Sequence, residues 1–526
     1  MRKHGTVAAG SLDMTRDADA EKSSTDSLLL NSLLGAWDFP RKMNLTNAPA
    51  GEREEVILEQ KLSSTQSPEA DRSADESYWR KLIPRRPTEI ILLAVIVLVI
   101  SVQLNYLLEV RTAIPLQDDW SYLQNMFRAI DTHRVGAWVF DSTNGHFVVP
   151  SALAYLFSSS YLSLDLSPLR LLNFPLCLAV FFLVAHVINR EVRSRFLRFY
   201  LYTGTCFIIF NLCFWEHLAL GGGFGAILSV LFGGIALYYI SKGTQPGANW
   251  KSTLLIGLLF LVASVLSLGA GYAAAAAALA LLALIGLKKL AASRPMPRYR
   301  TVISGLTCLV GFLAIVAHPF FHLTGRVIKA IYHFVLLAGS TGSSFLDKGS
   351  LTAQNVAFAC GIIVIVASLL MGFGFLTSPN SLNRLLPIFS LALVLFGIAG
   401  CVAVAIGRAY LPTSEFLNSR YTLYPSLCLL GILLNFAQSK RFLLTHIWCL
   451  IAASYLLDTA REQQMGFFRM QLYQRMEVAI RNSDTLSDEQ LRAALHWREN
   501  TKGVQRVIAR MRYERSNLFR SAPDSR

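Results

Sequence analysis

Residues 88–108 read TEIILLAVIVLVISVQLNYLL, a run in which Glu89 is the only charged side chain. About 20 predominantly apolar residues are enough for a helix to cross the hydrocarbon core of a bilayer. Backbone polar groups must be paired within such a segment, so this run predicts a membrane-spanning helix. Four basic residues stand just before it: Arg80, Lys81, Arg85 and Arg86. Basic residues favour the cytoplasmic side, so we expect this end of the span in the cytoplasm.

Further apolar runs follow as far as residue 457. They occupy residues 169–188, 199–214, 222–240, 252–270, 272–287, 301–317, 353–376, 385–406, 422–437 and 442–457. Hydrophobic residues make up 53% of the chain and charged residues only 16%, which excludes an ordinary soluble protein. We therefore expect an all-α integral membrane protein, a bundle of about eleven transmembrane helices with a large first outer loop.

The charge and cysteine patterns exclude other partner classes. Basic clusters at residues 190–198 and 288–300 lie between apolar runs, on the side expected to face the cytoplasm. The positive-inside rule thus explains the net charge of +15 without a nucleic-acid partner. The eight cysteines lie in or beside the apolar runs and show no CxxC spacing. We interpret them as apolar fillers, not as a disulfide or metal framework.

Composition divides the chain into three regions. Residues 1–80 are rich in Ser, Asp, Glu, Arg and Thr without apolar periodicity, which predicts a disordered cytoplasmic region. Residues 81–457 form the expected transmembrane domain. Residues 458–526 mix both charges and carry apolar residues at helical spacing, which predicts a small helical C-terminal region. An odd number of spans places this region outside the cytoplasm, and one span more or fewer would move it inside.

The first outer segment, between the first two spans, carries two adjacent carboxylates, Asp118 and Asp119. Two carboxylates side by side repel each other, so one of them is expected to have a raised pKa or a cationic partner. That setting suits a general base. The alternative is that they cap the amphipathic helix that begins near Trp120, because Asp is favoured at helix N-termini.

Two more outer segments, residues 318–352 and 407–421, would meet the first on one face of the membrane. Together the three segments supply these candidate binding residues: His146, Arg326, Lys329, Arg408, Arg420 and Tyr421. Arginine pairs with phosphate oxygens in bidentate fashion and lysine acts as a point charge, so the set suits a lipid phosphate. Snorkelling at a helix end is the alternative for any single arginine. Arg408 and Arg420 bracket one short loop, however, which favours ligand binding.

Two further features leave alternatives open. Glu216 and His217 stand at a span boundary and either line the same cavity or form an interfacial turn. No metal-ligand spacing occurs in the sequence. A divalent ion held by the paired aspartates, Asp118 and Asp119, stays an alternative to catalysis without metal.

Three short motifs resemble those of bacterial multi-spanning glycosyltransferases of the GT-C superfamily. They are Asp118-Asp119-Trp120, then Asn144-Gly145-His146 before an apolar helix, then Gly407-Arg408 followed by Ser419-Arg420-Tyr421. The resemblance covers residues 88–440 in architecture. Members often carry Glu directly before the histidine of the second motif, whereas Gly145 stands there in this chain.

The resemblance implies a sugar transferase of the inner (plasma) membrane, with its active site on the extracytoplasmic face. The implied donor is a polyprenyl-phosphate sugar, and the implied acceptor is a cell-surface glycan or lipid, as in polysaccharide or lipopolysaccharide assembly. Carried onto this chain, Asp118 would be the catalytic base with Asp119 supporting it. Arg408 and Arg420 would hold the donor phosphate. The implied reaction is a direct displacement with inversion at the anomeric carbon.

A multi-pass transporter is the main rival from another functional class. Transporters place ionisable residues near the bilayer midplane and show paired repeats. Here the middle of the spans is almost free of charge, and no internal repeat is visible. A non-catalytic flippase or assembly partner of a polysaccharide system is the third reading. Asp118→Asn would separate these classes, because only an enzyme should lose turnover while it still binds the donor.

Overall fold

The computed structural model of the chain describes residues 84–143, 146–293, 327–378, 380–437, 441–497 and 501–519. The expected disordered region, the apolar run at 301–317 and the candidate Arg326 lie outside these residues. The described part is built of helices with one small hairpin, in which β1 (Ser142–Thr143) pairs antiparallel with β2 (His146–Phe147).

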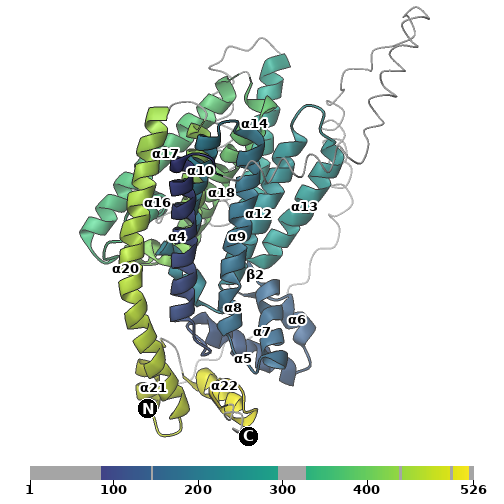
Figure 1. Cartoon of the computed structure of the whole chain (residues 1–526). Helices are drawn as coiled ribbons and strands as arrows, with labels where there is room; N and C mark the ends of the chain where they lie inside the picture. Colours follow the sequence, from purple (N-terminus) through teal and green to yellow (C-terminus); the bar gives the residue numbers. More distant parts are fainter. Residues whose placement is uncertain are drawn as a thin grey trace, which may run out of the picture. The chain divides into compact units, whose positions relative to one another are not determined.

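Eight helices in the described part are long and apolar enough to cross a membrane (Figure 1). They are α4 (Pro87–Val110), α8 with α9 (Ser167–Leu171 and Asn173–Glu191), α10 with η2 and α11 (Arg195–Ile209, Leu212–Phe214 and Trp215–Ala219), α12 (Phe224–Gly243), α13 (Trp250–Ser267), α14 (Ala270–Ser293), α17 (Leu351–Thr377) and α18 (Leu385–Gly407). The chain is therefore an α-helical, multi-pass membrane protein, as its composition predicts.

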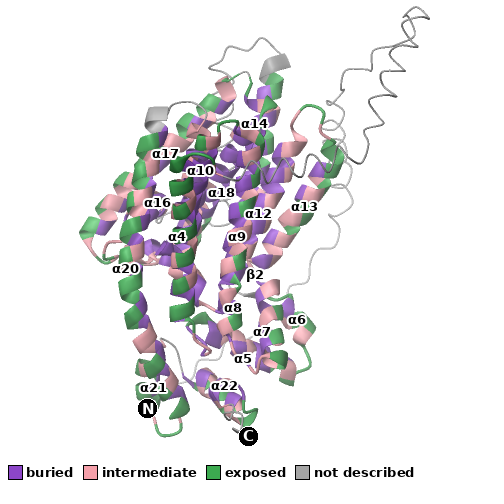
Figure 2. Cartoon of the chain, in the orientation of Figure 1, coloured by how far each residue is buried: buried purple, intermediate pink, exposed green. Residues whose placement is uncertain are grey.

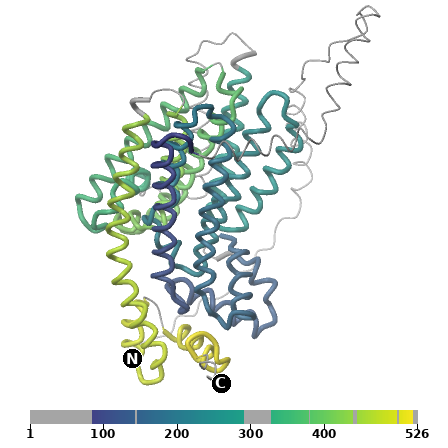
Figure 3. The backbone as a smooth tube through the Cα atoms, in the orientation of Figure 1, coloured from purple at the N-terminus to yellow at the C-terminus, as the bar shows by residue number. Residues whose placement is uncertain are grey.

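The last two expected spans take a different form from the others. The run at 422–437 forms α19 (Leu423–Phe436), whose 14 residues span about 21 Å, short of the roughly 30 Å hydrocarbon core. The run at 442–457 is the first part of α20 (Arg441–Arg481), a single helix of 41 residues. Figure 3 shows this helix as one continuous tube. The expected domain boundary after residue 457 therefore falls inside a continuous helix.

Small residues allow the central helices to approach closely. A Cβ atom built on Gly397 of α18 would lie 2.4 Å from Sγ of Cys428, and one on Gly400 would lie 2.1 Å from the Tyr424 ring, both on α19. Such close contact between helix backbones favours association where lipid offers no hydrophobic driving force.

The outer helices α13 and α17 are far less buried than the central helix α18. Only 22% of the residues in the most apolar stretch of each outer helix are buried, against 78% for α18 (Figure 2). Their exposed apolar faces suit contact with lipid.

One end of the bundle collects the segments that carry the candidate residues (Figure 1). After α4 the chain forms three short helices there: α5 (Asp118–Asp131), α6 (Val135–Val139) and α7 (Val149–Tyr161). Two short 3-10 helices follow α18: η7 (Thr413–Leu417) and η8 (Ser419–Tyr421). The second half of α20 reaches the same end and leads to α21 (Asp488–Ala494) and α22 (Lys502–Tyr513).

The C-terminal helix α22 docks on α5. Arg510 of α22 forms an ion pair of 2.5 Å with Asp131, and its guanidinium lies 4.5 Å from the centre of the Phe127 ring. The buried apolar side chains of α22 are Val504, Val507, Ile508 and Met511. The C-terminal region is thus joined to the first outer segment instead of forming a separate appendage. Both lie at the same end of the bundle (Figure 1).

The second expected outer segment contains a helix that was not predicted from the sequence. α16 (Val327–Ala338) is apolar, leads into η5 (Ser340–Gly342), and buries Leu336 and Leu337 against the bundle. Apolar residues at helical spacing explain the difference, because they favour a helix that packs on the bundle. Lys329, near the start of α16, is exposed.

Candidate functional site

Asp119 is a buried anchor of the first outer segment. Its side chain is 1% exposed, and Oδ2 lies 3.1 Å from Nη2 of Arg170. The same oxygen accepts hydrogen bonds from the backbone N–H groups of Leu116 at 3.0 Å and Gly221 at 3.3 Å. The Tyr155 hydroxyl donates to Oδ1. Burial raises the pKa of Tyr155, and the charge of Asp119 raises it further, so the phenol keeps its proton and remains a donor.

Arg170 explains how the sequence places this anchor. It lies on α8 and donates from Nη2 to the carbonyl oxygen of Ile114 at 2.7 Å and from Nη1 to that of Thr112. The guanidinium therefore binds the chain on both sides of the turn that leads into α5. The sequence-based expectation of a cationic partner for one carboxylate is met by Asp119. Neither aspartate is the N-cap residue of α5, a position that Gln117 occupies.

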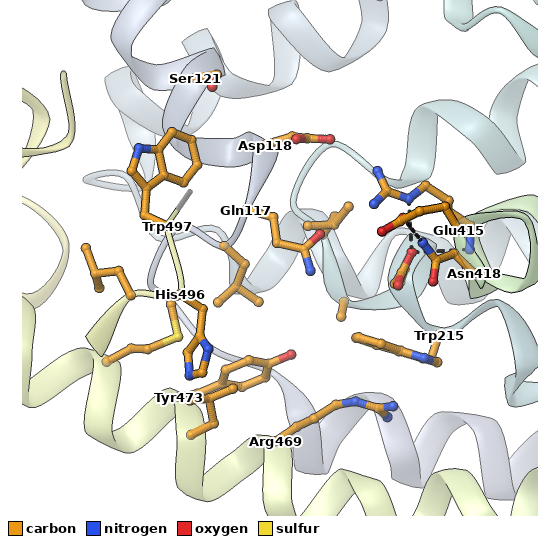
Figure 4. A pocket seen from close by; sticks show the side chains of 18 residues that line it. Gln117, Asp118, Ser121, Trp215, Glu415, Asn418, Arg469, Tyr473, His496 and Trp497 are labelled. Atoms are coloured by element: carbon orange, nitrogen blue, oxygen red, sulfur yellow. Dashed lines mark hydrogen bonds and ion pairs between the residues drawn. The ribbon is translucent and has the colours of Figure 1, made fainter. Parts of the chain in front are cut away.

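Asp118 has the opposite environment, although it is the adjacent residue. Its side chain is exposed and lines a cavity of about 500 Å³ at the end of the bundle. Figure 4 shows the carboxylate at the upper edge of this cavity. The lining residues are Leu116, Gln117, Asp118, Ser121, Trp215, Glu216, Ala219, Leu220, Glu415, Asn418, Arg420, Arg469, Leu472, Tyr473, Met476, Leu495, His496 and Trp497.

Arg420 lines the same cavity and is paired with Glu216. Nε of Arg420 lies 3.3 Å from Oε2 of Glu216, and Nε2 of His217 lies 2.7 Å from the Arg420 carbonyl oxygen. Burial lowers the pKa of Arg420, but the negative charges of nearby carboxylates, Glu216 first and Asp118 further away, contribute to raising it, so the guanidinium keeps its charge. Of the two readings of Glu216, the structure supports a place in the cavity wall.

Tyr421 brings the two loop arginines together. Its buried ring lies 5.4 Å from the guanidinium carbon of Arg408 and 5.8 Å from that of Arg420. Contacts of this kind attract a cation to the ring face. Arg408 directly follows α18, and Arg420 precedes α19. The Tyr421 ring therefore contacts two guanidiniums where the loop joins these two apolar helices.

Arg469 of α20 is a cavity residue that the sequence did not reveal. Its Nη2 lies 2.6 Å from Oε2 of Glu462, its Nη1 donates to the Tyr106 hydroxyl, and its guanidinium lies 3.5 Å from the centre of the Trp215 ring. Tyr473, one turn further along α20, lines the cavity beside it. These residues were missed because the C-terminal region was expected to stand apart from the transmembrane domain.

Two expected site residues lie away from the cavity. The ring of His146 packs against the turn between α13 and α14, where a Cβ atom on Gly269 would lie 2.6 Å from Nδ1. Lys329 lies on α16 and does not line the cavity. The structure thus places Asp118 and Arg420 in the lining of one cavity. Tyr421 and Arg408 are not part of the lining, but the Tyr421 ring contacts both Arg420 and Arg408. The structure leaves Asp119 behind the cavity wall.

The cavity combines charge with aromatic surface. Three carboxylates and two guanidiniums line it, together with two tryptophans, a tyrosine and a histidine. Among the described residues, no group of three or more His, Cys, Asp or Glu side chains is placed to hold a metal ion. A pocket of this size, with a few polar groups among aromatic walls, is typical of a small-molecule or headgroup site.

The fold and this cavity define the chain as an α-helical multi-pass membrane protein with a polar pocket at one end of its bundle. No protein-family model, curated protein or solved structure matches the chain. The likeness to GT-C glycosyltransferases therefore rests on the short motifs alone.

Proposed function

We propose that this protein is a membrane glycosyltransferase that moves a sugar from a polyprenyl-phosphate donor to a hydroxyl group of a cell-surface glycan or lipid. One observation carries the proposal: the exposed carboxylate of Asp118 and the guanidinium of Arg420 line one cavity beside the apolar bundle. About 300 residues of sequence separate them. A base and a cation at the edge of a membrane are the two groups that this transfer requires.

The donor phosphate would lie where the loop arginines meet the bundle. Arg420 shortly precedes α19 and Arg408 directly follows α18, so both would lie at the boundary that a lipid-linked phosphate occupies. Arg408 has no carboxylate within ion-pair distance among the described residues, whereas Arg420 shares its charge with Glu216. Bidentate contact with phosphate oxygens suits either guanidinium.

Asp118 would act as the general base. Its carboxylate takes the proton of the acceptor hydroxyl as that oxygen attacks the anomeric carbon. The bond from this carbon to the phosphate oxygen breaks, and the polyprenyl phosphate leaves with the electron pair. The arginines stabilise the charge that develops on the leaving phosphate. Attack from the face opposite the leaving group inverts the anomeric configuration.

Asp119 supports this reaction only through position. Its bonds to Arg170, Tyr155 and the backbone fix the turn before α5, which sets the direction of the preceding residue, Asp118, into the cavity. A preorganised base needs such support, because catalytic groups must be held within a fraction of an ångström of their working geometry.

The test uses the purified full chain in lipid nanodiscs with decaprenyl- and undecaprenyl-phosphate hexoses. Release of polyprenyl phosphate should depend on an added acceptor glycan and should fall in Asp118→Asn, with donor binding retained. Asp141→Asn is the matched control, because Asp141 is an exposed aspartate of the same segment outside the cavity lining. Movement of the lipid across the membrane without bond cleavage would instead favour a transporter or flippase. Unchanged release in Asp118→Asn would remove Asp118 as the base.

A further inference from the structure

The two ends of the cavity differ in the elements that build them. Arg420, Glu415 and Asn418 come from the loop between α18 and α19, next to the transmembrane bundle. His496 and Trp497 come from the segment between α21 and α22 in the C-terminal region. In Figure 4, Trp497 lies on the opposite side of the cavity from Glu415 and Asn418, with Asp118 above the space between them.

His496 and Trp497 form one wall of the cavity, the C-terminal wall, and the local structure around them is regular. α21 begins with a capping box between Ser487 and Gln490, and its end is closed by a backbone hydrogen bond of 3.0 Å from Trp497 to Arg492. His496 adopts a φ of 49°, the left-handed conformation that turns the chain towards α22. Leu495 is buried beside it.

Docking of the C-terminus fixes this wall relative to the base. The Asn517 side chain donates to the carbonyl oxygens of Ala113 at 2.8 Å and Leu164 at 2.6 Å. These residues belong to the first outer segment, which also carries Asp118. The apolar face of α22 packs on α5. The C-terminal wall and the Asp118 carboxylate therefore belong to one packed unit.

Trp497 offers an aromatic face to the cavity. Its ring is half-buried and lines the cavity, whereas its indole Nε1 is withdrawn from solvent. The ring face is therefore the part of Trp497 that a ligand can reach. A pyranose ring suits this surface, because its apolar C–H face packs on an aromatic ring while its hydroxyl oxygens meet the polar groups of the cavity.

We infer that His496 and Trp497 form the acceptor subsite, where a pyranose ring of the acceptor stacks on the Trp497 indole. The inference rests on the proposed function, because it assigns the second substrate of that reaction. The donor, being attached to a lipid, occupies the end of the cavity beside the bundle. The acceptor sugar occupies the end away from it, and Asp118 lies between the two.

Binding can be tested without any turnover. Saturation-transfer NMR would measure contact between the full chain in nanodiscs and the methyl glycopyranosides of glucose, galactose, mannose and N-acetylglucosamine. Nanodiscs replace maltoside detergent, whose sugar headgroup would compete for the site. The wild type should transfer saturation to the ring protons of at least one glycoside. Trp497→Ala should reduce the transfer about fivefold or more, as truncation of a central aromatic contact does.

Three variants make the result specific. Trp497→Phe should retain part of the transfer, because it keeps an aromatic face, although a smaller one. His496→Asn tests the neighbour with a residue that tolerates positive φ, and it should weaken binding less than Trp497→Ala. Trp250→Ala should change nothing, because Trp250 is a half-exposed tryptophan at the start of α13, the end of that helix away from His146. The midpoint of thermal unfolding verifies that each variant is folded.

The outcomes separate this inference from the proposed function. Equal saturation transfer in wild type and Trp497→Ala, or no transfer to any of the four glycosides, overturns the acceptor subsite. Should Trp497→Ala fail to fold, full retention of transfer in both Trp497→Phe and His496→Asn would overturn it. Tryptophan-dependent binding in a protein that cleaves no lipid-linked sugar would remove the transferase proposal and leave a carbohydrate site.

Discussion

Arg170 and Asp119 form an ion pair that is almost completely withdrawn from solvent, with Nη2 and Oδ2 3.1 Å apart and side chains that are 2% and 1% exposed. The pair ties α8 to the turn before α5. Its neighbour Asp118 is exposed to the cavity and has no such partner among the described residues. Two adjacent aspartates therefore have separable roles, one in folding and one in the chemistry that we propose.

Asp119→Ala should destabilise the protein strongly. It leaves the Arg170 guanidinium buried without a counter-charge, and breaking a buried ion pair in this way costs about 3–5 kcal/mol. Thermal unfolding of the purified protein in nanodiscs measures the effect. The double variant Asp119→Leu with Arg170→Met should recover part of the loss, because it removes both charges together. A midpoint for Asp119→Ala equal to that of wild type would show that the pair does not hold this turn.

Asp118→Asn should leave the unfolding midpoint close to that of wild type and affect turnover instead. General-base help contributes about 10²–10⁴-fold to a rate, and the amide cannot supply it. Single-turnover release of polyprenyl phosphate measures the rate, and donor binding is measured separately. A loss of both stability and donor binding in this variant would assign Asp118 a structural role like that of Asp119.

Much of the fold could be predicted from the sequence, because the bilayer imposes a length on every spanning helix. Eight apolar helices of the described part coincide with expected runs. The meeting of Asp118 and Arg420 was also predictable, since loops that alternate across the membrane leave both residues on one side. Spanning length does not predict α16, because its 12 residues are too few to cross the hydrocarbon core.

The rest depends on packing between distant segments, which one sequence does not show. Successive residues on a helix point about 100° apart, so two adjacent aspartates can lie in different environments. The choice of Asp119 depends on Arg170, which the sequence did not single out. The docking of α22 did leave a signal: Val504, Val507, Ile508 and Met511 recur at helical spacing and indicate an apolar face. Nothing in that pattern names α5 as its partner.

Arg420→Ala should weaken binding of the donor about ten- to a hundredfold, since hydrogen bonds to charged groups contribute about 1.5–3 kcal/mol. Arg420→Lys should restore only part of the affinity, because the bidentate fork is lost. Glu216→Gln should strengthen binding, because the guanidinium would no longer share its charge with a carboxylate. Titration of the nanodisc-embedded protein with polyprenyl-phosphate hexose gives these affinities.

Arg384→Ala is the control for the arginine series, because Arg384 precedes α18 at the end opposite Arg408 and pairs with Glu191. Its donor affinity should equal that of wild type. Equal affinity in Arg420→Ala and wild type would detach the loop before α19 from the donor site. Weaker binding in Glu216→Gln would instead make the pair, not the free guanidinium, the element that the donor requires.

The last prediction concerns the side of the membrane on which the cavity opens. Tyr410 after α18 and Tyr513 at the end of α22 are both exposed, at 60% and 91%, and belong to segments at the cavity end of the bundle. Asn249, exposed in the turn before α13, follows α12, whose 20 residues cover about 30 Å from the cavity end. Single cysteines at Tyr410 and Tyr513, in a chain without its eight native cysteines, should react with an impermeant thiol reagent in intact cells, because the basic clusters favour the opposite side for the cytoplasm. A cysteine at Asn249 should react only after the cells are permeabilised.

The reverse labelling pattern would keep the fold but place the cavity on the cytoplasmic side, where an extracytoplasmic lipid-linked donor could not reach it. Labelling of Tyr410 and Tyr513 from different sides would contradict the docking of the C-terminal region on α5.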